Sequence, residues 1–129
     1  MILADTSVWI DHLRAKSAAL ARLLDHGEVL GHPWVVGELA LGHLGQREEV
    51  IGLLASLPQA TVATPGEVLI LLERHKLYGV GIGYVDAQLL AATKLTPGAT
   101  LWTTDRRLVA VSSRLGYAFD PETSGEDHR

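Results

Sequence analysis

Four acidic residues stand out because each occupies a place where a carboxylate is unusual. Asp5 and Asp105 each follow a short apolar run, whereas Glu38 and Asp86 have apolar residues on both sides. Carboxylates are seldom buried unless they are paired or bound to a metal ion. Two like charges about 4 Å apart repel by roughly 4 kcal/mol at an effective dielectric near 20, so a shared cleft needs a compensating cation. Oxygen ligands favour Mg²⁺ or Mn²⁺, which can activate water for attack on a phosphodiester.

Each acid also has a purely structural interpretation. Asp5 and Asp105 precede expected helices and could be N-caps, and Asp86 could lie in a first turn, where the helix dipole favours an acid. Glu38 falls a turn or more inside its expected helix, where it could face solvent. The four together are harder to explain in this way than any one of them alone.

The elements that would position these acids follow from the apolar pattern. Short apolar runs predict strands, and apolar residues at helical spacing predict helices. The expected strands are 1–4, 29–30, 61–64, 99–103 and 117–119, and the expected helices are 8–15, 20–24, 34–43, 50–57, 68–77, 84–95 and 108–115. This alternation indicates an α/β fold with a mostly parallel sheet of four to five short strands, covered on both faces. Ligands of such sheets bind outside the carboxyl ends of the strands.

The composition is that of one globular domain. The chain has 129 residues, of which 47% are apolar and 20% charged, and it has no cysteine for disulfides or thiolate metal sites. We expect a domain at 1–119 and a disordered acidic tail at 120–129. The tail has four acids against Arg129, a net −3 of the total −4, so the domain is nearly neutral and carries no strong footprint for duplex DNA or anionic lipid. No apolar run of about 18 residues and no basic leader is visible, so we expect a cytoplasmic protein without membrane contact.

The ordered set of acids resembles the motifs of PIN-domain endoribonucleases, specifically the VapC toxins of bacterial and archaeal toxin–antitoxin pairs. The matching segments are 5–11 (Asp-Thr-Ser-Val-Trp-Ile-Asp), Glu38-Leu39 with Gly42, Asp86-Ala87, and 101–105 (Leu-Trp-Thr-Thr-Asp). The resemblance covers almost the whole chain and implies a PIN-like three-layer α/β/α fold. It further implies an RNA substrate, a small antitoxin that occludes the site, and a homodimer.

The resemblance also implies roles for individual residues. Its catalytic acids correspond to Asp5, Glu38, Asp86 and Asp105. Among them, Asp5, Asp86 and Asp105 would bind Mg²⁺, with Mn²⁺ as a substitute, and Glu38 would complete the metal shell or orient the water. Thr6 and Thr103 would donate hydrogen bonds to the carboxylates. The family often has another acid two residues after the last Asp, and Arg107 stands there instead, which leaves that role to Asp105 alone.

The remaining candidates have weaker signals. Arg106 and Arg107 could contact RNA phosphates, although adjacent arginines at a helix start are commonly solvated. Asp11 is expected on the exposed side of the first helix, and glycines 79, 81 and 83 predict a flexible turn that lets the backbone approach Asp86. The histidines lack ligand spacing and are expected at the surface or partly buried. The tryptophans are interpreted as core or interface residues; they are Trp9, Trp34 and Trp102.

Three other functions are weighed against the nuclease. A haloacid-dehalogenase-like phosphatase needs a second Asp two positions after Asp5, where this chain has Ser7. A phospho-acceptor receiver domain needs a late lysine, and the last lysine here is Lys94, inside an expected helix. A catalytically silent binding or regulatory protein on the same scaffold stays open, because acids alone show capacity and not turnover.

Overall fold

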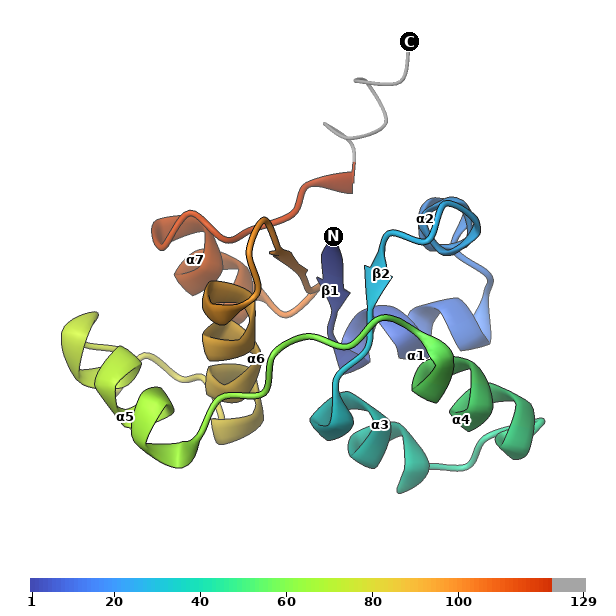
Figure 1. The fold of residues 1–129 in the computed structure, drawn as a ribbon, viewed down its shortest axis with the longest axis horizontal. Coiled ribbons are helices and arrows are strands. Elements are labelled where there is room, and N and C mark those ends of the chain that lie inside the picture. The colour runs from blue at the N-terminus through green and yellow to red at the C-terminus, as the bar shows by residue number, and fades with distance from the viewer. Residues whose placement is uncertain (122–129) are drawn as a thin grey trace, which may run out of the picture.

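The computed structural model describes residues 1–121 and has a short parallel sheet between two groups of helices (Figure 1). The α/β fold class is therefore confirmed. The elements in chain order are β1 (Ile2–Ala4), α1 (Thr6–Arg14), α2 (Ala18–Asp25), β2 (Val29–Leu30), α3 (Pro33–Ala40), α4 (Arg47–Ser56), α5 (Pro65–Arg74), α6 (Tyr84–Leu95), β3 (Thr100–Trp102) and α7 (Arg106–Arg114). Most of the expected acidic tail, residues 122–129, lies outside the described residues.

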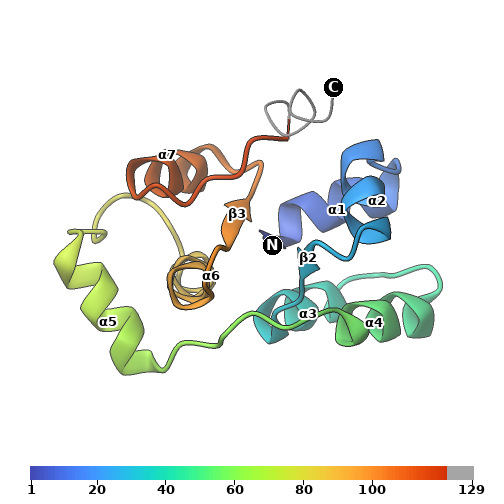
Figure 2. The same ribbon diagram turned by 45° about the horizontal axis from the view of Figure 1, so that its top comes forward.

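The sheet is built around β1. The strand order is β2-β1-β3, and both pairings are parallel, with Ile2 opposite Val29 on one side and Thr100 on the other. Helices α6 and α7 lie on one side of the sheet and α1, α2 and α4 on the other, as Figures 1 and 2 show. Because all three strands run the same way, their carboxyl ends meet at one edge. This edge is followed by the three segments that begin at Asp5, Gly31 and Thr103.

A single bridge flanks the sheet on each side, and one of the two falls within an expected strand, at 117–119. Gln59 bridges Gly31 beside β2, and Ala118 bridges Leu101 beside β3. The strand expected at 61–64 is wrong: this segment is irregular. The amide of Thr61 donates to Thr96 Oγ1 at 2.9 Å, next to the end of α6, and not to a neighbouring strand.

The helices begin and end where their capping residues require. Helix α5 starts at Pro65, earlier than expected, because Thr64 and Glu67 form a reciprocal capping box in front of the apolar run. Helix α3 ends at Ala40 and not at 43. Glycines 42 and 45 follow at once, and glycine is among the least favourable residues for continuing a helix. Among the described helices, none combines the length and apolar character needed to cross a bilayer.

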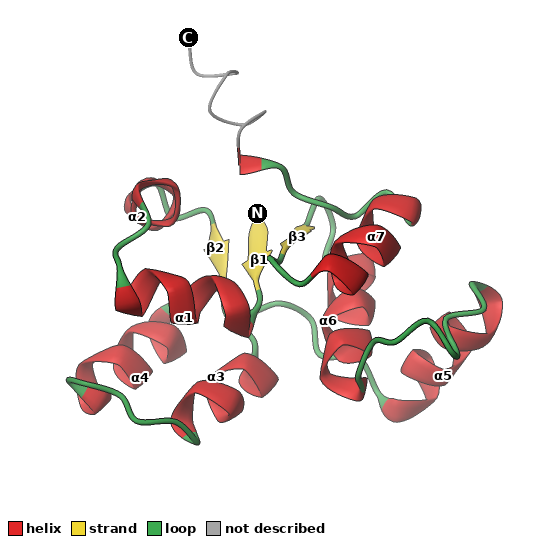
Figure 3. Cartoon of the chain, turned by 180° about the vertical axis from the view of Figure 1, so that it is seen from behind, coloured by secondary structure: helices red, strands yellow, loops and turns green. Residues whose placement is uncertain are grey.

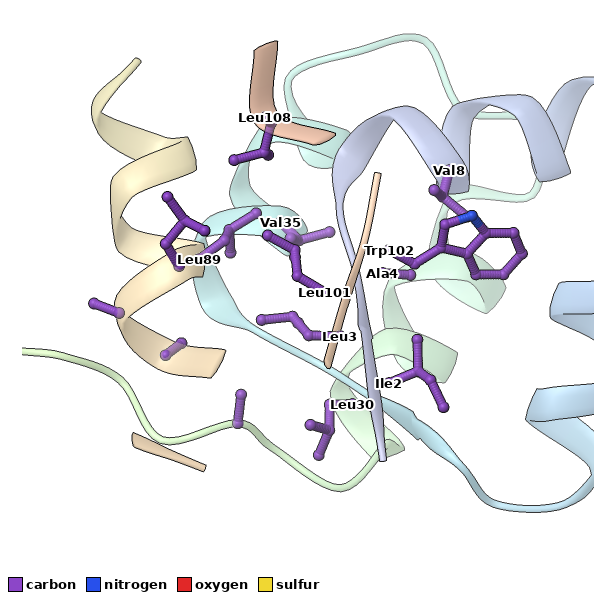
Figure 4. Close-up of a cluster of buried hydrophobic side chains, with 14 of the residues drawn as sticks. Ile2, Leu3, Ala4, Val8, Leu30, Val35, Leu89, Leu101, Trp102 and Leu108 are labelled. Carbon is purple, nitrogen blue, oxygen red and sulfur yellow. The ribbon is translucent and has the colours of Figure 1, made fainter. Parts of the chain in front are cut away.

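The core lies between the sheet and the helices on its two sides. Figure 4 shows side chains from β1, β3 and α6 packed together, among them Leu3, Leu89 and Leu101, which are at most 1% exposed. Trp9 and Trp102 belong to this core, as expected. Trp34 does not: it is 40% exposed and its ring meets Tyr84 edge-on at a centroid distance of 5.8 Å.

Candidate active site

Asp5 is the most constrained of the four acids. It directly follows β1, and its amide donates to the carbonyl of Trp102 at 3.0 Å. Its Oδ1 accepts hydrogen bonds from Ser7 Oγ at 2.5 Å and from the Val8 amide at 3.3 Å, so that Asp5 is also the N-cap of α1. The side chain is buried, and burial raises the pKa of Asp5, although the hydrogen bonds from Ser7, Thr103 and the backbone oppose this rise.

Thr103 connects Asp5 to Asp105 at the end of β3. The Thr103 hydroxyl donates to Asp5 Oδ2 at 2.5 Å and accepts from the amide of Asp105 at 3.1 Å. Asp105 in turn caps α7, because its Oδ1 accepts from the amides of Arg107 and Leu108, both at 3.0 Å. Capping and a place in the acidic site are thus compatible, since each cap uses only part of the carboxylate.

Asp86 reaches the same edge of the sheet from another element. It occupies the first turn of α6, and its Oδ2 accepts from the amide of Gly83 at 3.0 Å. The pKa of Asp86 is raised by partial burial and, further, by the negative charges of Asp105 and Asp5. Such mutual repulsion requires the three carboxylates to lie near one another. Figure 3 shows α6 beside β3 and α7, with the chain before α6 returning toward the start of α7.

Glu38 joins the site through Thr6. The Thr6 hydroxyl donates to Glu38 Oε1 at 2.5 Å, and Thr6 is the neighbour of Asp5 in the chain. Glu38 is exposed on α3, which agrees with the solvent-facing alternative considered for it. The two threonines expected to hold carboxylates thus each do so, Thr6 with Glu38 and Thr103 with Asp5.

The donor set fits a hydrated hard cation. Glu38, Asp86 and Asp105 each keep one carboxylate oxygen without a hydrogen-bond partner in the described part of the chain. Within residues 1–121, no group of three or more His, Asp or Glu side chains is arranged closely enough to hold a metal by itself. Mg²⁺ does not need such a cage, because it binds through one or two carboxylates and keeps several waters. The identity of the direct ligands among Asp5, Asp86 and Asp105 stays a prediction.

The two arginines after Asp105 have different surroundings. Arg106 is exposed at the first position of α7. Arg107 is also exposed, but its Nη1 lies 3.5 Å from the carbonyl of Gly81, in the segment 79–83 that we name the glycine loop. The amide that ends this loop, at Gly83, is the one that donates to Asp86, in agreement with the expected approach of backbone to this acid. Asp11 is exposed, as expected.

Two residues at this edge were not found from the sequence. Ser7 donates to Asp5 and accepts from the amide of Thr104 at 3.1 Å. His32 is completely buried after β2, and its Nδ1 accepts from the amide of Trp34, so the expectation of surface histidines is wrong here. Burial lowers the pKa of His32 to about 4. A weak sequence signal was present, because His32 comes two residues after its strand, at the same edge as Asp5 and Thr103.

Two hollows border Glu38. One, of about 590 Å³, lies between α1, α3 and the segment before α4, with Ile10, Leu13 and Arg14 in its wall. The other, of about 650 Å³, is lined by Trp34 of α3, by Leu41 directly after this helix and by Val85 of α6. Glu38 therefore stands between two surfaces that can receive other molecules.

Comparison with known proteins gives a consistent result. The family model of the PIN domain matches residues 2–113. The chain is also 52% identical over 124 residues to proteins named Ribonuclease VapC32 from two strains of Mycobacterium tuberculosis, CDC 1551 / Oshkosh and ATCC 25618 / H37Rv. Each alignment covers 96% of this chain and 100% of the relative.

Proposed function

This chain belongs to the PIN-domain family, as a relative of the VapC ribonucleases, and we propose that it is a Mg²⁺-dependent endoribonuclease, the toxin of a toxin–antitoxin pair. The observation that carries the proposal is the convergence of acids from distant segments at the carboxyl edge of the sheet. Thr103 ties Asp5 to Asp105, and the charges of both raise the pKa of Asp86. The domain is nearly neutral overall, but several carboxylates lie at one edge of the sheet. Their mutual repulsion favours binding of a cation there.

The chain's own residues have distinct tasks in this proposal. Asp5 and Asp86 hold the cation directly, and Asp105 is the next ligand. Glu38, which is exposed on α3, completes the metal shell or orients the attacking water. Thr6 and Thr103 restrict the carboxylates that they bond, so that the ligand oxygens are in place before the substrate arrives.

The cation supplies the chemistry that carboxylates cannot supply alone. Mg²⁺, or Mn²⁺ as a substitute, lowers the pKa of water and offsets the charge that develops on the phosphoryl group. The protein holds the reacting groups at the open edge of the sheet, where a flexible RNA strand has access. Arg106 is the better placed of the two arginines for a phosphate contact, because its side chain has no hydrogen bond within residues 1–121.

The proposal extends to an antitoxin, a second copy of the chain and the location in the cell. A small antitoxin would cover the hollow between α1 and α3, whose wall includes Glu38, and so block the site. A second copy of the chain would cover the apolar hollow beside Trp34 and Leu41, where large apolar side chains are exposed. An RNA substrate and an antitoxin partner would both support a location in the cytoplasm. Co-purification with a small protein encoded next to it, and a mass twice that of the 13.9 kDa chain, would support these assignments.

The decisive experiment is RNA cleavage by purified protein. Wild-type protein with Mg²⁺ should cut RNA chains internally, EDTA should stop the reaction, and the Asp5→Asn variant should not cleave. Equal cleavage by Asp5→Asn and wild type would falsify the assignment. A silent binding protein, the alternative that the family match leaves open, would bind RNA or antitoxin without cutting under any metal tested. A phosphatase would release phosphate from small monoesters and leave RNA intact.

A further inference from the structure

Arg107 stands where related nucleases often have another acid, and its backbone supports the site. It is the second residue of α7, and its amide donates to Asp105 Oδ1 at 3.0 Å. This bond does not depend on the identity of the side chain. The arginine side chain itself lies against the glycine loop, at Gly81.

The Arg107 side chain occupies the position that a side chain at residue 81 would need. A Cβ placed on Gly81 would meet Arg107 Cδ at 2.7 Å, Nη1 at 2.8 Å and Cζ at 3.0 Å. Gly81 also has a φ of +84°, which side-chain-bearing residues rarely adopt. The hydrogen bond from Nη1 to the Gly81 carbonyl is long, at 3.5 Å, so packing of the stem and guanidinium contributes most of this contact.

Gly79 provides a comparison within the same loop. Its φ is +73°, similar to that of Gly81, yet a Cβ on Gly79 would meet no atom within 4 Å. Both glycines therefore have a positive φ, but only at Gly81 would a Cβ collide with another side chain. Only Gly81 needs to be glycine in order to admit another side chain.

The glycine loop leads directly to Asp86. Gly83, two residues after Gly81, donates its amide to Asp86 Oδ2 at 3.0 Å. This amide is the one hydrogen-bond partner of the Asp86 carboxylate within residues 1–121. A loop that moved would therefore release the carboxylate from the position set by the start of α6.

We propose that Arg107 is a positioning residue that connects two of the site's acids, its amide holding Asp105 and its side chain clamping the glycine loop that holds Asp86. Where related nucleases often have a further acid, this chain thus has a side chain that connects α7 to the glycine loop. The link joins α7 to the loop before α6 through the contact between Arg107 and Gly81. The role in catalysis rests on the proposed nuclease function, whereas the clamp on the loop is a property of the protein alone.

The first test measures the loop without metal or RNA. Amide hydrogen exchange of residues 79–86 should be about fivefold faster in Arg107→Ala than in wild type, the change expected for loss of one interaction. Arg106→Ala is the matched control and should leave exchange unchanged. Gly81→Ala should speed exchange more than Gly79→Ala, because both strain a positive φ but only Gly81→Ala also displaces Arg107. Unchanged exchange in Arg107→Ala would overturn the proposal.

The second test separates positioning from a contact with RNA phosphate. If Arg107 positions Asp86, kcat should fall about tenfold in Arg107→Ala with little change in KM, as for other outer partners of metal ligands. Arg107→Lys keeps an aliphatic stem beside Gly81, so its kcat should lie between those of wild type and Arg107→Ala. A raised KM with unchanged kcat, together with a weaker dependence of binding on salt, would assign Arg107 to the phosphate instead. If wild type cleaves no RNA, the nuclease proposal fails and the exchange result alone decides the clamp.

Discussion

The hydroxyl of Thr103 lies 2.5 Å from Oδ2 of Asp5, although 98 positions separate the two residues in the chain. The same hydroxyl accepts from the amide of Asp105, so one small side chain sets the relative positions of two acids. Parallel pairing of β1 with β3 makes this possible, because it aligns Ala4 with Trp102 immediately before them. The site is therefore assembled by the sheet register.

Replacing Thr103 with Val should reduce cleavage about 10- to 100-fold with a small loss of stability. Valine has a similar shape, so packing is kept, but it cannot donate to Asp5 or accept from Asp105. The measurement is kcat with RNA, beside thermal unfolding. The control is Thr104→Val, because that hydroxyl makes no hydrogen bond in the described part of the chain, although its amide bonds Ser7. Equal activity of both variants would contradict the role of Thr103.

Replacing Asp5 with Asn should abolish activity and raise the thermal stability of the metal-free protein. The loss should exceed about 100-fold, since even outer partners of metal ligands contribute up to that amount. Stability should rise because burial raises the pKa of Asp5, so its ionised form opposes folding near neutral pH. Thr103 can rotate its hydroxyl to accept from the new amide group. A marked fall in melting temperature would show that the carboxylate is primarily structural.

Mg²⁺ or Mn²⁺ should stabilise the wild-type protein, and EDTA should reverse the effect. A ligand that binds only the folded state stabilises it by about 2.7 kcal/mol at 100 times its dissociation constant. Protons compete with the cation, and the raised pKa values of Asp5 and Asp86 move this competition to higher pH than for ordinary carboxylates. The melting shift caused by metal should therefore shrink as pH falls toward the acid range. If metal raised the melting temperature of Asp86→Asn as much as that of wild type, Asp86 would not be a ligand of the cation.

Much of the fold was predictable because its signals are local. Apolar runs ended by Asp5 and by Asp105 indicated buried strands followed by caps, and both strands and both caps are present. The strand expected at 61–64 is absent, and the amide of Thr61 bonds the side-chain hydroxyl of Thr96 instead of a neighbouring strand. The sequence of residues 61–64 contains no signal for this bond.

In the candidate site, too, local signals were visible in the sequence and contacts between distant segments were not. The acids were found because apolar surroundings make a carboxylate conspicuous, whereas Arg107 and Gly81 are ordinary residues for a helix start and a turn. Their contact depends on how α7 meets the loop before α6. Trp34, predicted for the core or an interface, is not in the core: it lies at the second position of α3, where its ring turns outward to Tyr84.

His32 should make the protein less stable in mild acid. Its pKa is about 4 in the folded protein, against 6.5 when unfolded, because burial disfavours the charged ring. The folded state therefore binds fewer protons, and its stability is complete above pH 6.5 and falls as pH decreases toward 4. A shift of this size corresponds to about 3 kcal/mol. Protonation would also take Nδ1 away from the amide of Trp34 and so uncap α3, the helix that carries Glu38.

The variant His32→Asn isolates this contribution. Asparagine can cap α3 through its side-chain oxygen but does not titrate, and it also removes Nε2, which is buried without a partner in residues 1–121. Asp5 and Asp86 act in the opposite direction, because their raised pKa values make the fold gain stability as pH falls. The quantity to measure is thus the difference in unfolding free energy between wild type and His32→Asn, from urea denaturation between pH 7.5 and 4.5. This difference should change in favour of the variant as pH falls, and a constant difference would show that His32 is not the group that titrates.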